Sequence, residues 1–313
     1  MGADADWAPG VITPEDAGTE PGLNGLLAYL SDTEKVDKLL ISEKALIFRG
    51  FGIAPGQLED VMNALLRDRL AYIHGNSPRT KIGNNVYTST EYPAEFTISM
   101  HNELSYAARW PARLLFFCET PPAAGGATSL TDGVAWLSAL DPEVREAFSG
   151  GVRYLQNLPD GRGLGRSWQD TFETSDRDEV EAYLSATGAE WEWTLDGLRV
   201  TQVRQATTRH PVTGAEVWFN QSDQWHAAAL DDETSVALLD ILPEQEMPQS
   251  VRFGNGDPIP AEYMLQVKER GLGLAVDVDW HIAGDLLLID NVLVAHGRRS
   301  FSGSRRVLVA MSD

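Results

Sequence analysis

The stretch Met100-His101-Asn102-Glu103-Leu104-Ser105 places a histidine and a carboxylate two residues apart. Side chains alternate between the two faces of an extended strand, so we expect His101 and Glu103 on one face and Asn102 on the other. An imidazole and a carboxylate directed at a common point can bind a metal ion. The same pair could instead be solvated on an edge strand, because a short motif is only a hypothesis until its structural context is known.

The best candidate for a third ligand is His296, which follows the apolar run Asp285-Leu286-Leu287-Leu288-Ile289 and ends the stretch Asn291-Val292-Leu293-Val294-Ala295-His296. Two histidines and one carboxylate on one face of a metal, with the other positions open, form the ligand set of non-haem Fe(II) oxygenases. Iron held in this way can also bind a cosubstrate and dioxygen. A metal hydrolase with an activated water is an alternative use of the same ligands.

The composition is that of a soluble globular protein. The chain has 313 residues, of which 43% are hydrophobic and 23% charged. Length alone leaves one or two domains open. No apolar run approaches the roughly eighteen residues that a membrane helix requires, so we expect no membrane span.

The formal net charge of −21 makes nucleic acid an improbable partner, because an acidic surface repels a phosphate backbone. The acidic stretch Met1-Gly2-Ala3-Asp4-Ala5-Asp6 lacks the basic and apolar regions of a signal peptide, which favours a cytoplasmic protein. Cys118 is the single cysteine, which excludes an intrachain disulfide and a cysteine-based zinc site. Its apolar neighbours indicate a buried strand thiol.

The order of apolar patterns predicts a mainly β protein with helical insertions. We expect a loose N-terminal arm over residues 1–35, with one helical turn over 23–30, and a helix-containing insertion over about 132–270, within a single domain over 1–313. The long polar segment 72–99 is typical of a functional loop. The predicted strands are 44–49, 113–118, 127–130, 190–194, 199–207, 216–219, 275–278, 285–290 and 306–311, and the predicted helices are 55–70, 132–140, 141–148, 175–187, 231–242 and 260–269.

The last strand begins with the adjacent arginines Arg305 and Arg306. Only one of them can share a face with Leu308 and Ala310, and the alternation assigns that place to Arg306. An arginine buried beside apolar side chains needs an anionic partner, and its planar fork matches a carboxylate. The alternative is an ordinary exposed pair of arginines.

Together these motifs carry a resemblance to a known family. His101-x-Glu103, then Pro121 through Gly125-Gly126-Ala127-Thr128, then Asp290-Asn291 through His296, then Arg305-Arg306 resemble the taurine dioxygenase and clavaminate synthase-like superfamily of Fe(II)/2-oxoglutarate-dependent oxygenases. The similarity covers about residues 95–313 and is weaker over 44–70.

The resemblance implies a double-stranded β-helix, or jelly roll, with His101, Glu103 and His296 as metal ligands at one mouth. It also implies 2-oxoglutarate as a cosubstrate, with Thr128 and Arg306 holding its distal carboxylate. The implied chemistry uses O2, converts 2-oxoglutarate to succinate and hydroxylates a nearby substrate. Desaturation and epoxidation would begin in the same way.

Departures from family patterns narrow these expectations. Taurine dioxygenase has an arginine for its sulfonate four residues beyond the cosubstrate arginine, and the matching residue here is Ala310, which argues against taurine. Related halogenases lack the carboxylate ligand, whereas Glu103 is present. Many members have Asp in place of this Glu.

The segments Trp110-Pro111, Phe116-Phe117-Cys118-Glu119 and Val217-Trp218-Phe219-Asn220 look most like members that hydroxylate amino acids or carrier-tethered aminoacyl groups in natural-product biosynthesis. Substrate residues of such enzymes vary and lie on loops. The candidate substrate contacts are Asn102, Asn220, Gln221 and His226, and for His226 a hydrogen-bonded structural role is the alternative. A jelly-roll binding protein without catalysis is the alternative from another functional class.

Overall fold

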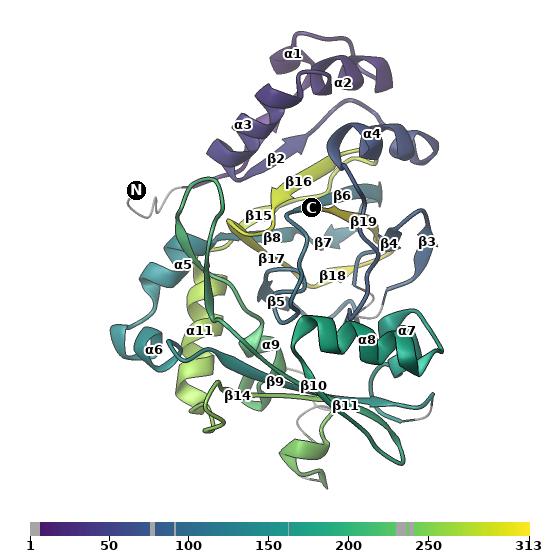
Figure 1. The fold of residues 1–313 in the computed structure, drawn as a ribbon. Coiled ribbons are helices and arrows are strands. Elements are labelled where there is room, and N and C mark those ends of the chain that lie inside the picture. The colour runs from purple at the N-terminus through teal and green to yellow at the C-terminus, as the bar shows by residue number, and fades with distance from the viewer. Residues whose placement is uncertain (1–6, 76–78, 91, 162, 230–236, 238–240) are drawn as a thin grey trace.

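Two β-sheets form the centre of the molecule (Figure 1). The computed structural model describes the whole chain except residues 1–6, 76–78, 91, 162, 230–236 and 238–240. The larger sheet has the strand order β1-β2-β16-β6-β19-β4-β3 and the smaller one β15-β8-β17-β5. The strands of the larger sheet are β1 (Gly10–Ile12), β2 (Ala45–Phe48), β3 (Lys81–Gly83), β4 (Val86–Thr88), β6 (Arg113–Thr120), β16 (Leu286–Asp290) and β19 (Arg306–Ser312). Those of the smaller sheet are β5 (Ile98–His101), β8 (Thr128–Asp132), β15 (Val276–Val278) and β17 (Val294–Arg298).

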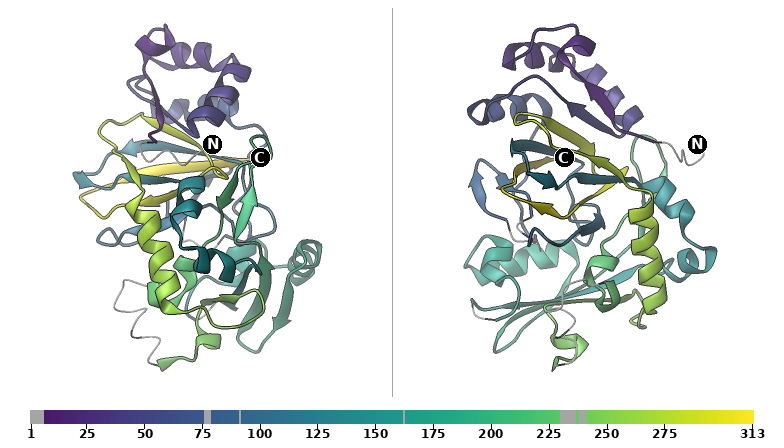
Figure 2. Two further views of the ribbon diagram at one scale, coloured as in Figure 1. Left: turned by 90° about the vertical axis from the view of Figure 1, so that its left-hand side faces the viewer. Right: turned by 180° about the vertical axis from the view of Figure 1, so that it is seen from behind.

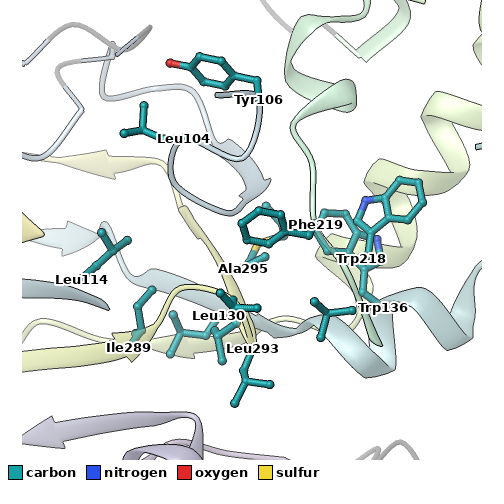
Figure 3. Packing of buried hydrophobic residues seen from close by; sticks show 14 of the residues in the cluster. Leu104, Tyr106, Leu114, Leu130, Trp136, Trp218, Phe219, Ile289, Leu293 and Ala295 are labelled. Carbon is teal, nitrogen blue, oxygen red and sulfur yellow. The ribbon is translucent and has the colours of Figure 1, made fainter. Parts of the chain in front are cut away.

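The two sheets enclose a common apolar core, which is the arrangement of a double-stranded β-helix. Side chains of the larger sheet, such as Leu114, Ile289 and Val309, pack in one cluster with Leu130 of β8 and Val294 of β17. Figure 3 shows part of this cluster, with Leu114 and Ile289 at one side and Trp136, Trp218 and Phe219 at the other. Strands from both ends of the chain alternate in each sheet, so the fold closes only when distant segments meet. A minor pair, β7 (Ala124–Gly125) with β18 (Phe301–Ser302), lies at the rim.

Residues 7–35 belong to a layer that covers the outer face of the larger sheet and do not form a loose arm, and the helical turn predicted over 23–30 is present as α2 (Leu23–Leu30). Strand β1 pairs in parallel with β2, and Leu26, Tyr29 and Leu30 are buried. The Gly and Pro residues that suggested disorder mark short capped helices instead, as at Thr13, where a capping box opens the first one. The helices of this layer are α1 (Pro14–Ala17), α2 (Leu23–Leu30), α3 (Thr33–Glu43), the 3-10 turn η1 (Pro55–Gln57) and α4 (Leu58–Leu65), at the top of Figure 1.

The segment between β8 and β15 forms the predicted insertion, but it contains a sheet as well as helices. This sheet has the order β10-β11-β9-β14 and lies at the bottom of Figure 1. Strands β9 (Val152–Pro159) and β14 (Gln249–Phe253) were not predicted, because polar side chains interrupt their apolar pattern. The other strands are β10 (Glu190–Trp193), β11 (Gly197–Arg204) and the separate hairpin β12 (Thr207–Arg209) with β13 (Glu216–Trp218).

The helices of the insertion largely match the prediction. Asp132 caps the first of them through the Val134 amide, and Gly188 ends the helix that Asp176 opens. The long α11 runs beside both the insertion and the smaller central sheet (Figure 2). The bounds are α5 (Gly133–Ala139), α6 (Pro142–Ala147), α7 (Trp168–Phe172), α8 (Arg177–Thr187), α9 (Ser222–Trp225), η2 (Ala227–Ala229), η3 (Glu244–Glu246) and α11 (Ala261–Gly273).

Most of the helix predicted over 231–242 lies outside the described residues. Cys118 is buried, as predicted, and burial raises the pKa of its thiol to about 11. In the described part of the chain, no helix combines the length and apolar character needed to span a bilayer.

Candidate metal centre

The three predicted metal ligands come together between β5 and β17. His101 and His296 are paired across the two strands, and their ring centroids lie 4.2 Å apart. Nε2 of His296 lies 3.7 Å from Oε2 of Glu103. All three residues are buried, and one ligand atom from each lies within 4.8 Å of the others. This donor set is the one expected of a non-haem iron site.

Glu103 reaches this cluster from a turn and not from a strand. Strand β5 ends at His101, and Leu104 has a φ of 56°. Glu103 lies beside His101, as predicted, but the alternation of side chains along a strand is not the cause, because Glu103 is not part of the strand. Asn291 holds the turn, because its Oδ1 accepts from the Glu103 amide at 2.8 Å and its Nδ2 donates to the Glu103 carbonyl at 3.1 Å.

Both histidines are held in the neutral form that binds metals. Burial, and then the neighbouring His101 and Arg79, lower the pKa of His296 well below its usual value. Burial also lowers the pKa of His101 despite the nearby Glu103 carboxylate. Nδ1 of His101 lies 3.0 Å from the Ser99 carbonyl, which leaves Nε2 for a ligand role.

Arg79 pairs with the carboxylate ligand, and no sequence pattern had singled it out. Its Nη2 donates to Oε2 of Glu103 at 2.5 Å, and both side chains are buried. Its guanidinium carbon lies 4.6 Å from the centre of the Tyr72 ring. Although burial opposes the charge, the Glu103 carboxylate raises the pKa of Arg79, so it remains a cation.

A small cavity of about 30 Å³ adjoins the ligands. Thr128 lies on its wall, as predicted for a cosubstrate contact, and its Oγ1 accepts a hydrogen bond from Nε1 of Trp280 at 3.0 Å. The residues around the cavity are Arg79, Ser89, Thr90, Ile98, His101, Phe116, Thr128, His296, Gly297, Arg298 and Arg305.

The prediction that Arg306 faces the cosubstrate is contradicted, because Arg305 lines the cavity instead. The Arg306 side chain is 51% exposed and pairs with Glu119. Strand β19 is buried on both faces: Leu308 and Ala310 pack under the N-terminal helices, whereas Val307 and Val309 face the inner core. The apolar alternation could not distinguish these faces, and a register shift follows Arg306.

Arg305 has the surroundings of an anion-binding residue. Its Nε donates to the Gly126 carbonyl at 3.0 Å and its Nη1 to Oγ of Ser89 at 3.2 Å. No carboxylate among the described residues forms an ion pair with it. Burial, and next the Arg298 guanidinium, lower its pKa to about 10, so it is charged at neutral pH. A half-buried cation without an acidic partner, next to the metal ligands, is a good binding partner for an anionic ligand.

The four predicted substrate contacts have structural roles, and none of them lines the small cavity. Nδ2 of Asn102 donates to the Asn291 carbonyl, and Nε2 of Gln221 donates to the Asn102 carbonyl. Asn220 joins the Ala206 carbonyl to the Ser222 amide, and His226 lies beside the Ile259 carbonyl. The sequence showed polar residues near the motif but could not show that the backbone already satisfies them.

A second cavity of about 510 Å³ lies on the other side of Arg79. Its size is within the usual range of small-molecule sites. It is lined by Tyr72, Arg79, Lys81, Tyr87, Arg166, Gln169, Asp170, Glu173, Thr174 and Ser175.

Comparison with known proteins gives consistent matches along the chain. The family model "Taurine catabolism dioxygenase TauD, TfdA family" matches residues 12–311. The dapdiamide synthesis protein DdaC of Enterobacter agglomerans is 37% identical over 281 residues, which cover 89% of this chain and 84% of that protein. A clavaminate synthase-like protein of Arabidopsis thaliana is 32% identical over 321 residues, which cover 97% of this chain and 93% of that protein.

Among solved structures, a putative α-ketoglutarate-dependent 2,4-D dioxygenase from Burkholderia xenovorans matches with a TM-score of 0.50 and 15% identity. The match covers 90% of this chain and 87% of that one. This likeness supports the fold.

Proposed function

Because the chain belongs to the TauD, TfdA family of dioxygenases, we propose that it hydroxylates an aliphatic C–H bond of a small amino-acid-like metabolite in a biosynthetic pathway. The chain is an oxidoreductase that depends on Fe(II), 2-oxoglutarate and O2. The similarity to a dapdiamide synthesis protein supports the biosynthetic setting. Cytoplasmic residence and the form of the substrate, free or carrier-tethered, are part of the proposal.

The observation that carries the proposal is the set of buried donors around one cavity. His101, Glu103 and His296 would hold the iron, since two neutral imidazoles and a carboxylate lie within 4.8 Å of one another. Arg305 and Thr128 would hold 2-oxoglutarate, since a half-buried arginine with no acidic partner in the described chain matches its distal carboxylate. The residues present fit both groups.

When bound, iron and 2-oxoglutarate would supply the oxidising power: 2-oxoglutarate would lose CO2 and become succinate, and O2 would deliver one oxygen atom to succinate and one to the substrate. The residues of the chain would orient the metal ligands and shield the site from water. Asn291 fixes the turn that presents Glu103, and the Ser99 carbonyl orients His101. Burial keeps both imidazoles unprotonated and excludes water.

Succinate release from a panel of free amino acids, N-acylated amino acids and carrier-bound aminoacyl groups tests the proposed reaction. We expect at least one compound to stimulate succinate formation and to gain one oxygen atom, traced with ¹⁸O2 and mass spectrometry. Loss of two hydrogens would indicate desaturation, and oxygen gain only at an alkene would indicate epoxidation. Succinate formation that no amino-acid-like compound stimulates would contradict the proposed substrate class.

A further inference from the structure

Arg79 lies between the two cavities and lines both of them. Its side chain is 2% exposed. Nη2 is paired with Glu103, whereas Nε and Nη1 are buried and have no hydrogen-bond partner among the described residues. A guanidinium offers five N–H donors in a planar fork, so donors of Arg79 are available to a ligand.

The Glu103 carboxylate, which pairs with Arg79, is also one of the three candidate metal ligands. Oε2 of Glu103, which accepts from Arg79, also lies 3.7 Å from Nε2 of His296. A metal ion bound by these ligands would share the negative charge that now compensates Arg79. The guanidinium would then be a buried cation with a weakened counter-charge, which is unfavourable until another anion approaches.

The other cations of the larger cavity already have partners. Nζ of Lys81 lies 2.6 Å from Oε2 of Glu173, and Arg166 donates to the carbonyls of Gly75 and Asp170. The Tyr72 ring, 4.6 Å from the guanidinium carbon, supports Arg79 in its position between the cavities. Arg79 differs from the other cations in having two buried nitrogens, Nε and Nη1, that bind no other group in the described chain, so an anion entering the larger cavity could bind there.

We propose that Arg79 binds a free carboxylate of the substrate, which enters through the larger cavity and is anchored at the boundary with the metal centre. Charge-assisted hydrogen bonds to a buried guanidinium are strong and selective for anions. The inference rests on the proposed function and narrows it. In a carrier-tethered aminoacyl group the α-carboxylate has become a thioester, so Arg79 favours the free acid.

Binding of matched pairs of compounds tests this role. Protein loaded with Fe(II) and 2-oxoglutarate under nitrogen is titrated by calorimetry with N-acetyl amino acids and with the corresponding amides. We expect the acids of at least one pair to bind at least about thirty-fold more tightly than the amides, as for other buried charge pairs. Arg79→Gln should abolish this preference, Arg79→Lys should retain part of it, and the control Lys38→Gln, at an exposed lysine that lines neither cavity, should leave it unchanged.

The visible absorption of iron-chelated 2-oxoglutarate separates the possible results. A preference that persists in Arg79→Gln, or a wild-type protein that binds neither member of any pair, would overturn the role of Arg79. A folded Arg79→Gln protein that loses the absorption would show that Arg79 positions Glu103, which also overturns it. If the wild-type protein lacks the absorption, the proposed function itself fails.

Discussion

The two faces of strand β19 are both buried, yet they serve different purposes. The inner face carries Val307 into the core, and Arg305, which directly precedes the strand, lines the metal-ligand cavity, whereas the outer face carries Leu308 toward the N-terminal helices. Arg305 lacks an acidic partner in the described chain, but Arg306 has one in Glu119 at the surface. Burial alone therefore does not identify the face of the strand that serves the site. The face is identified by its polar groups and by whether they already have partners.

Replacing each arginine by leucine in turn tests most strongly whether Arg305 and Arg306 have different roles. Arg305→Leu should weaken 2-oxoglutarate binding by about 2–5 kcal/mol, roughly thirty-fold to several thousand-fold, because it removes the partner of a desolvated carboxylate. Arg306→Leu should leave the affinity within about two-fold, since rim charges contribute little. Affinities follow from anaerobic titration of the iron-loaded protein. Equal losses in the two variants would contradict the assignment of faces.

Shortening a side chain on the outer face of β19 should lower the stability of the fold and leave the affinity for 2-oxoglutarate unchanged. Leu308 is 5% exposed and packs in the cluster under the N-terminal helices. Leu308→Ala should lower the free energy of unfolding by about 2–5 kcal/mol because it leaves a cavity. Urea denaturation measures this loss. The affinity of the folded variant for 2-oxoglutarate should be unchanged, and a parallel loss of affinity would show that the two faces are not separate.

Low pH should reduce the stability of the folded protein through His74, a buried histidine that contacts the insertion. Burial lowers the pKa of His74 to about 4, although a hydrogen bond with Gln156 acts in the other direction. Between pH 6.5 and about 4 the unfolded chain binds a proton that folded His74 does not, so stability falls as pH falls. The loss is about 3 kcal/mol at most.

Replacing His74 by phenylalanine isolates this contribution. The ring of His74 stacks on Phe172, with centroids 5.1 Å apart, so phenylalanine preserves the apolar contact. Unfolding free energies of His74→Phe should decline less between pH 6.5 and 4 than those of the wild type. The control is His281→Phe, since the His281 side chain is 71% exposed. An unchanged decline in His74→Phe would rule out His74 as its source.

The smallest effect should come from the surface pair on the outer side. Arg306 is 51% exposed, and its pair with Glu119 is therefore screened by solvent. Arg306→Gln should change the free energy of unfolding by less than about 1 kcal/mol. Thermal unfolding at low and high salt measures it. A much larger loss would mean that Arg306 has a role inside the fold.

From the sequence alone, the residue types and their order predicted that His101, Glu103 and His296 meet, and the structure brings them within 4.8 Å of one another. His101, Glu103 and His296 are the donors that iron accepts, and their order along the chain limited the choices. The central strands β6, β16 and β19 were also predicted, since long apolar runs favour buried strands.

What failed depended on tertiary packing. The choice of Arg306 assumed one apolar face per strand, and the N-terminal helices bury the second face. Asn102 and Gln221, which were predicted to contact the substrate, hydrogen-bond with the backbone of distant segments and do not line the small cavity. Arg79 was missed because it lies in a polar segment without periodicity, and only its burial beside Glu103 distinguishes it.

The most direct test of the central claim is an anaerobic titration of the purified protein with Fe(II) and 2-oxoglutarate, followed by visible absorption. We expect the charge-transfer band of a chelated keto acid only when both are present. The band should vanish in His296→Ala and persist in the surface control His281→Ala. Folded wild-type protein that gives no band, or a band that survives in His296→Ala, would contradict the assignment of the metal centre.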